Sequence, residues 1–133
     1  MSSPVEPVHV RNRIADQQVD ASDGARFERF DPARPDRLVS TAPESTATDV
    51  TAAVGAASDA AAAWRRTTPT QRAEVLTRAA RLLAERSDDI AAEMVREEGK
   101  PLADAKNESS RTPRNLELYA GEAYRLKIGR AHV

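Results

Sequence analysis

Apolar residues recur every three or four positions from Thr46 onward, and this spacing predicts amphipathic α-helices. Four segments carry the pattern, and they begin near residues 46, 68, 87 and 101. Trp64 is expected to be the largest core anchor of the first helix. The residues expected to face inward are Val50, Val54, Ala57, Ala61 and Trp64 in the first segment, Val75, Leu76, Ala79, Leu82 and Leu83 in the second, Ile90, Met94 and Val95 in the third, and Leu102, Ala105, Leu116, Tyr119, Ala120, Ala123 and Leu126 in the fourth.

Capping signals mark where the first two helices begin. Thr46 is followed three residues later by Asp49, which resembles a capping box. Thr68 and Gln71 form a second box, and Pro69 stands at the first helical position, where a missing N–H costs nothing. Both helices are therefore expected to start within a residue of these threonines.

Glycine and proline residues indicate where the last two helices end, begin or are interrupted. Gly99 predicts a left-handed stop at the end of the third helix, and Pro101 then opens the fourth at a tolerated position. Pro113 lies in the middle of the fourth segment, where it removes one backbone hydrogen bond. We expect Pro113 to kink this helix or to split it in two.

The first 45 residues have a different pattern, with five of the eight prolines and no helical spacing. Residues 8–19 alternate partly between apolar and polar, and residues 26–30 and 38–41 are each expected to form a short strand. The Asp-Gly turn within residues 21–25 predicts a hairpin. Phe27 and Phe30 cannot share a face at a period of two, so we expect a bulge or an early strand end.

Composition limits what this helical set can bury. Of the 40% of residues that are hydrophobic, nearly half are alanine: 25 residues, against 23 Leu, Ile, Val and Phe together. Alanine removes little apolar area from water, so its burial contributes little free energy. The expected molecule is a helical piece that needs a larger body to pack against.

Charge and cysteine content exclude several classes of protein. The 20 basic and 21 acidic residues give a net charge of −1, which is not the footprint of a nucleic-acid-binding protein. The chain has no cysteine, so it can hold neither a disulfide nor a thiol nucleophile. No apolar run is long enough to span a membrane and no signal peptide opens the chain, so a cytoplasmic location is expected, with no membrane partner.

Candidate chemical residues are few and scattered. His9 and His132 stand near the termini, and the serine pair 109–110 has no nearby base. The acid pairs 88–89 and 97–98 are neighbours along helices, and such neighbours do not face each other. The glycines are isolated, so no phosphate-cradling loop is formed. We therefore assign no catalytic, cofactor-binding or metal-binding residue to this chain.

An ordered succession of short motifs resembles the N-terminal part of the NAD(P)-dependent aldehyde dehydrogenase superfamily, over roughly residues 10 to 126. Among its branches the succession is most similar to semialdehyde and general aldehyde dehydrogenases of bacteria and archaea. The motifs, in order, are Phe30-Asp31-Pro32-Ala33, Ala42-Pro43-Glu44-Ser45-Thr46-Ala47 with Asp49-Val50 and Ala52-Ala53-Val54, Trp64-Arg65, Pro69 with Arg72-Ala73 and Leu76, Ala79-Ala80 with Leu82-Leu83 and Arg86, Glu98-Gly99-Lys100-Pro101-Leu102 with Ala105, and Tyr119-Ala120-Gly121-Glu122-Ala123.

The resemblance implies an α/β fold and oxidation of an aldehyde to a carboxylic acid. The full fold would comprise a doubly wound cofactor domain, a catalytic domain and an oligomerisation strand pair, and the whole enzyme would be a homo-oligomer that uses NAD or NADP. Its cysteine nucleophile, glutamate base and cofactor motifs would lie downstream of the matched region. The resemblance also implies a monovalent-cation site near the carbonyls of residues 29 and 30 and the acid at Glu97.

The expected organisation is an extended segment with short strands over residues 1–45, a helical part of the cofactor-binding domain over 46–126, and a non-native tail over 127–133. The tail reads as the translated start of a common short-read sequencing adapter. This mostly helical piece, with a short hairpin and about four helices, is expected to bind no cofactor and to be inactive alone. The alternative is a stand-alone helical interaction module that docks through its apolar stripes.

Overall fold

The structure, a computed structural model, describes residues 6–125. These residues form two compact units. The first unit contains the described residues up to Arg65 together with Arg96–Gly99, and the second contains Arg66–Val95 and the described residues from Lys100 onward. The expected tail at residues 127–133 lies outside the described residues, and the division at residue 45 stays a prediction.

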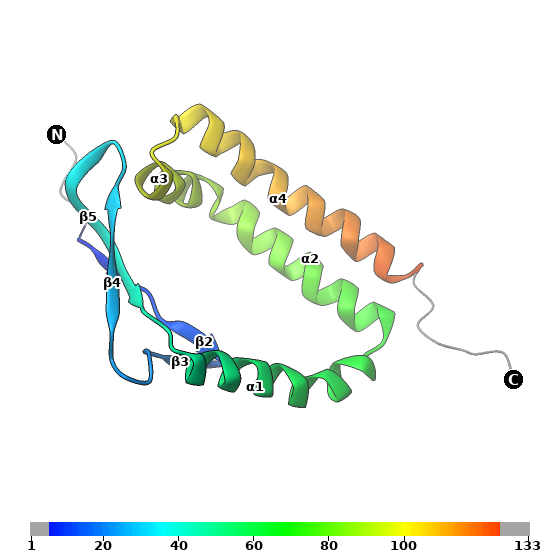
Figure 1. The fold of residues 1–133 in the computed structure, drawn as a ribbon. Helices are drawn as coiled ribbons and strands as arrows, with labels where there is room; N and C mark the ends of the chain where they lie inside the picture. The colour runs from blue at the N-terminus through cyan, green and yellow to red at the C-terminus, as the bar shows by residue number, and fades with distance from the viewer. Residues whose placement is uncertain (1–5, 126–133) are drawn as a thin grey trace, which may run out of the picture. The chain divides into compact units, whose positions relative to one another are not determined.

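Five short strands belong to the first unit (Figure 1). They are β1 (Val8–His9), β2 (Asn12–Ile14), β3 (Gln17–Val19), β4 (Arg26–Asp31) and β5 (Arg34–Pro43). One sheet has the strand order β1-β5-β4, with β1 parallel and β4 antiparallel to the central strand β5. The second sheet is the antiparallel pair of β2 and β3.

The predicted hairpin around residues 21–25 is wrong, although the turn itself is present. Gly24 has a φ of +76° and its amide donates to the carbonyl of Ala21 at 2.9 Å. However, β3 and β4, the strands on either side of this turn, pair with other strands. The hairpins close instead at Ala15–Asp16, where both residues have positive φ, and at Pro32–Ala33. Neither closing pair contains a glycine, so the usual sequence signal for a tight hairpin was missing.

The irregularity expected between Phe27 and Phe30 is confirmed. Arg29 pairs with Ser40 but Phe30 pairs with Leu38, so β5 holds one extra residue, Val39, at this point. A second shift follows between Phe30 and Asp31. A bulge of this kind bends the strand locally and breaks the alternation of faces. The spacing of the two phenylalanines therefore predicted the irregularity in the backbone pairing of β4 and β5.

Four helices follow, close to the predicted boundaries. They are α1 (Ala47–Arg65), α2 (Pro69–Glu85), α3 (Ser87–Glu98) and α4 (Leu102–Ala123). The capping box at α2 is present in full, and Gly99 ends α3 with a φ of +71°. Pro101 is the N-cap of α4 and not its first helical residue, a correction of one position.

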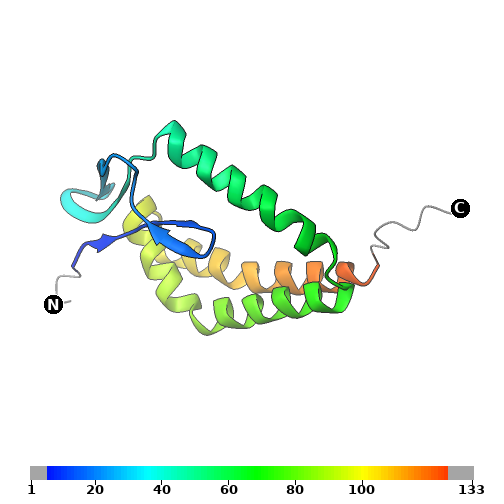
Figure 2. The ribbon, with the colours of Figure 1, turned by 90° about the horizontal axis from the view of Figure 1, so that it is seen from below.

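Helix α4 runs unbroken through Pro113. Of the two outcomes expected for this proline, the split into two helices is wrong, and the kink stays a prediction. A proline inside a helix costs about 3 kcal/mol because it lacks the N–H and its ring crowds the preceding turn. Here Pro113 is buried, and α4 packs along α2 (Figures 1 and 2). Packing on both sides of the proline outweighs the local penalty.

The helix pair α2 and α4 meets through small residues. The predicted inward stripe of α2 is corrected: Val75 and Leu82 are exposed, whereas Ala73 and Ala80 are buried. Alanines let two helix backbones approach closely, and this close approach decides which face turns inward. The buried apolar residues of the described chain, apart from two prolines, are all alanines: Ala21, Ala73, Ala80, Ala91, Ala105 and Ala120.

Large apolar side chains are exposed in both units. Trp64, expected to be a core anchor, keeps 51% of its surface exposed, and Val54 on the same helix keeps 64%. The expected inward residues Val50, Leu102 and Tyr119 are also exposed. The correction has a simple cause, because helical spacing shows that a face is apolar but not what covers it. The exposed large apolar residues are Val8, Val10, Phe27, Phe30, Val50, Val54, Trp64, Val75, Leu82, Leu102, Leu118, Tyr119 and Tyr124.

Replacing Gly99 with alanine should destabilise the first unit. Its φ of +71° disfavours any residue with a Cβ by about 1 to 2 kcal/mol. An added Cβ would also stand 3.1 Å from the Cβ of Pro32, tighter than ordinary contact. Gly121→Ala is the matched control, because Gly121 is helical with open space around it, and this change should stabilise α4 slightly. Urea unfolding followed by circular dichroism should shift in opposite directions for the two variants, and a shared direction would contradict the interpretation.

Candidate functional site

A polar network around Asp20 is the most connected charged cluster in the first unit. The Nε2 atom of His9 lies 2.7 Å from the Asp20 carboxylate, to which its N–H donates, and the Nδ1 atom lies 2.9 Å from the Thr41 hydroxyl. Arg11 and Arg26 approach the same carboxylate at 3.6 and 3.5 Å. The hydrogen bond from His9, aided by the two guanidinium groups, lowers the pKa of Asp20. Asp20 is therefore held as an anion among positive or donating groups.

Asp49 forms a second polar centre at the start of α1. Its carboxylate accepts from the amide of Thr46 at 2.7 Å, from the Thr46 hydroxyl at 3.0 Å and from the amide of Ser22 at 3.0 Å. The predicted contact between Thr46 and Asp49 is confirmed. The contact to Ser22 was not foreseen, and it ties the turn before β4 to the helix. Asp49 is thus a structural tie between Ser22 and the start of α1.

The Asp49 tie should weaken in acid. The amide of Thr46 lowers the pKa of Asp49 most, while burial opposes the effect. A carboxylate with a lowered folded pKa stabilises the fold above its unfolded value of about 3.9, and that stabilisation is lost as pH falls through the folded value. We expect protection of the Thr46 amide from hydrogen exchange to fall below about pH 4.

Two variants make this pH prediction specific. Asp49→Asn should remove the acid dependence of Thr46 protection, because the amide side chain does not titrate. Asp59→Asn changes an exposed aspartate on the same helix and should leave the profile unchanged. A profile that is flattened by Asp59→Asn, or kept by Asp49→Asn, would count against the assignment.

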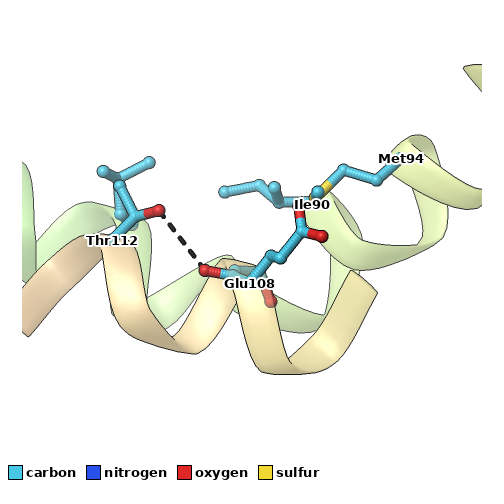
Figure 3. Close-up of a pocket in the computed structure, with 6 residues that line it drawn as sticks. Ile90, Met94, Glu108 and Thr112 are labelled. Atoms are coloured by element: carbon cyan, nitrogen blue, oxygen red, sulfur yellow. Dashed lines mark hydrogen bonds between the residues drawn. The ribbon is translucent and has the colours of Figure 1, made fainter. Parts of the chain in front are cut away.

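Three hollows in the described surface are small. One of 140 Å³ in the second unit is lined by Leu83, Ile90, Met94, Glu108, Ser109 and Thr112, and Figure 3 shows Ile90 and Met94 opposite Glu108 and Thr112. Two others measure 230 and 240 Å³. Pockets for cofactors or drug-sized ligands are usually about 300 to 1,000 Å³. None of these three hollows has the volume that a nicotinamide dinucleotide needs.

The serine and acid pairs singled out in the sequence have structural partners. The hydroxyl of Ser109 lies 2.9 Å from that of Ser87 and also donates to the carbonyl of Lys106 at 3.2 Å. The carboxylate of Asp88 pairs with Lys106 at 3.0 Å across the surface. These contacts join the start of α3 to α4. His132 lies outside the described residues.

The implied cation position draws on residues of one unit. Residues 29 and 30 and Glu97 all belong to the first unit, where Gly99 approaches Pro32 closely. Within residues 6–125, no three His, Cys, Asp or Glu side chains gather in a way that could hold a metal ion. The cation site therefore stays a prediction, as does the absence of catalytic and cofactor residues.

The glycines among the described residues stand singly and so do not form a glycine-rich turn. A dinucleotide is normally held by a glycine-rich turn against a helix N-terminus. We therefore derive no catalytic step through a cofactor from this part of the chain. Over the same residues, no helix combines the length and apolarity needed to cross a membrane.

Sequence reasoning missed Asp20, which His9, Arg11 and Arg26 surround in the first unit. His9 was set aside because it lies near a terminus, yet both of its ring nitrogens are hydrogen-bonded. The only available signal was the concentration of polar and charged residues among short strands. Pairing of β1 with β5, over 30 residues away, brings His9 to Thr41, and local patterns do not encode such a contact.

The profile of the aldehyde dehydrogenase family matches residues 19–132. Two curated relatives are each 38% identical to the chain: the NADP(+) succinate-semialdehyde dehydrogenase GabD of Escherichia coli over 113 residues and the alpha-ketoglutaric semialdehyde dehydrogenase of Bacillus subtilis over 114. These alignments cover 85% and 86% of this chain but only 23% of each relative. The chain thus spans about a quarter of the length of these enzymes.

A solved structure shows the same fold. The NAD-dependent aldehyde dehydrogenase from Sinorhizobium meliloti superposes with a TM-score of 0.87 at 30% sequence identity. The superposition covers 93% of this chain and 26% of that one. The strands and helices described above therefore occur together in a much longer protein.

Proposed function

This chain belongs to the aldehyde dehydrogenase family, and from that premise we propose that it is the N-terminal part of an enzyme that oxidises an aldehyde to a carboxylic acid with NAD or NADP. The described residues contribute scaffold to such an enzyme. The thiol nucleophile must come from elsewhere, since the 133 residues contain no cysteine.

The exposed apolar faces carry this proposal. Leu118 and Tyr119 on α4 each keep 63% of their surface exposed, and Val54 on α1 keeps 64%. No large apolar side chain in the described residues is fully buried. Exposed apolar surface on this scale marks an interface, and the family fold supplies protein that could cover it. A stand-alone interaction module would share these exposed stripes but not the family match.

The finer properties follow from the relatives. Both curated relatives are semialdehyde dehydrogenases by name, so we propose a semialdehyde as the substrate class. The full enzyme would act in the cytoplasm as a homo-oligomer, with no nucleic acid or membrane as partner. Residues 46–126 would form part of its cofactor-binding domain and would follow the extended segment 1–45 in the sequence.

A chimera tests the scaffold role directly. Residues 1–125 of this chain would replace the aligned N-terminal part of the Escherichia coli relative, to which the chain is 38% identical. We expect the chimera to oxidise succinate semialdehyde and to reduce NADP, because the family fold would bury the exposed faces. Formation of NADPH is followed by its absorbance.

Charge on an exposed face provides the control. In the chimera, Leu118→Asp should abolish activity if α4 packs under the rest of the enzyme, whereas Glu117→Asp, at an exposed neighbour that is already acidic, should not. A folded, inactive parent chimera would contradict the proposal. Equal activity of the two variants would place this face of α4 on the outside.

The source gene tests the tail separately. Reading genomic DNA beyond codon 126 should reveal a frame that continues and encodes a cysteine nucleophile. A genomic frame that stops after Val133 would contradict the adapter interpretation of residues 127–133.

A further inference from the structure

The N-terminal strand β1 has little backbone or apolar support. It consists of only two residues, which pair in parallel with Ser40 and Thr41 of β5. Burial of apolar side chains does not anchor β1. Val8, in the strand, is 56% exposed and Val10, just beyond it, is 46% exposed. One further backbone bond joins the amide of Val10 to the carbonyl of Thr41 at 2.9 Å. Short parallel pairs of this kind are weak on their own.

Side-chain hydrogen bonds add to the short backbone pairing of β1. His9 is the half-buried residue of β1, and its two ring nitrogens reach Thr41 on β5 and Asp20 after β3. Asp20 also attracts Arg11, just beyond β1, and Arg26, the first residue of β4. One carboxylate thus joins residues 9 and 11 at the N-terminal strand to the start of β4. Its removal would leave Arg11 and Arg26 without their shared counter-charge.

We propose that His9, Asp20 and Thr41 form a latch that holds the strap, residues 6–10, on the edge of β5. Opening of the latch frees the edge of β5 at Ser40 and Thr41, because β4 occupies only the opposite edge. The latch therefore sets how readily the strap leaves this edge of β5.

Hydrogen exchange of single amides tests the latch in the full 133-residue chain. The amide of Val10 reports on the strap, and the amide of Glu44, which donates to Ala25 at 3.0 Å, reports on the same unit away from β1. Asp20→Asn and His9→Ala should each raise the exchange rate of Val10 relative to Glu44 by about tenfold, the factor for one ordinary hydrogen bond. Thr41→Val keeps the side-chain volume and should raise the ratio to a smaller extent.

Asp16→Asn is the matched control. Asp16 is also an aspartate in a short ion pair, with Arg13, but it lies in the turn between β2 and β3. This variant should leave the ratio of Val10 to Glu44 unchanged. The proposal is overturned if Val10 is unprotected in the parent chain, if the latch variants leave the ratio unchanged, or if Val10 and Glu44 lose protection equally. The last result would show that Asp20 holds the whole unit and not the strap.

Discussion

No NADH or NADPH should form when the purified 133-residue chain is mixed with succinate semialdehyde and NAD or NADP. The reason is chemical, because aldehyde oxidation by the family route needs a thiolate to attack the aldehyde, and the chain contains no cysteine. The three hollows of 140 to 240 Å³ described above are also too small for a dinucleotide. Absorbance of the reduced cofactor measures the outcome.

The full-length Escherichia coli relative serves as the positive control in the same assay. Turnover that scales with the concentration of the 133-residue chain, and that survives removal of contaminating enzyme by an affinity step, would contradict the prediction. Such a result would require a nucleophile other than a thiol among these residues.

Ala105→Asp should be the most damaging single substitution in the helical unit. Ala105 lies in the first turns of α4 and has no exposed surface. A carboxylate placed there has no water and no partner, and a buried unpaired charge costs about 3 to 5 kcal/mol. That is a large part of the stability of an ordinary domain, so we expect loss of much of the helical signal in circular dichroism.

Ala103→Asp is a close control for this prediction. It introduces the same side chain two residues earlier on the same helix, at an exposed position. Both changes carry the same helix-propensity cost, at most about 0.7 kcal/mol, and both place an acid near the helix N-terminus. Urea unfolding of the two variants therefore isolates the cost of burial. Equal midpoints would show that α4 does not pack at Ala105.

The latch and the Asp49 tie give the first unit two different kinds of polar support. Asp49 closes a contact that begins within its own helix start, with Thr46 three residues away. Asp20 bonds to His9, which lies 11 residues away in the sequence. His9 in turn bonds to Thr41, which lies 32 residues from His9. Local contacts form with little loss of chain entropy, whereas the second kind depends on the sheet being assembled. The strap should therefore open more readily than the start of α1.

Local signals predicted the elements well. Thr68, Gln71 and Pro69 located the start of α2, and Gly99 located the end of α3. The spacing of Phe27 and Phe30 indicated a bulge that β5 supplies at Val39. In each case the determinant lies within a few residues of its effect, through a cap, a positive φ or the pleat of a strand.

The partners of the strands and the burial of the side chains depended on tertiary contacts and not on local sequence signals. The Asp-Gly turn at residue 24 had the sequence of a hairpin, yet the strands around it take other partners because β5 pairs with both β1 and β4. Pro113 had the sequence of a helix break, yet packing against α2 keeps α4 continuous. Trp64 had the spacing of a core residue and remains half exposed.

The sequence by itself determined where helices start and stop, that the chain has no thiol chemistry, and that its apolar faces are rich in alanine. Only the tertiary structure decided that Ala73, Ala80 and Ala105 are buried, and that His9 meets Asp20 and Thr41. The physical reason is the distance along the chain over which each signal acts. Caps and helical periodicity act within one or two turns, whereas the partner of a strand or of an apolar face is chosen by the free energy of the whole assembly.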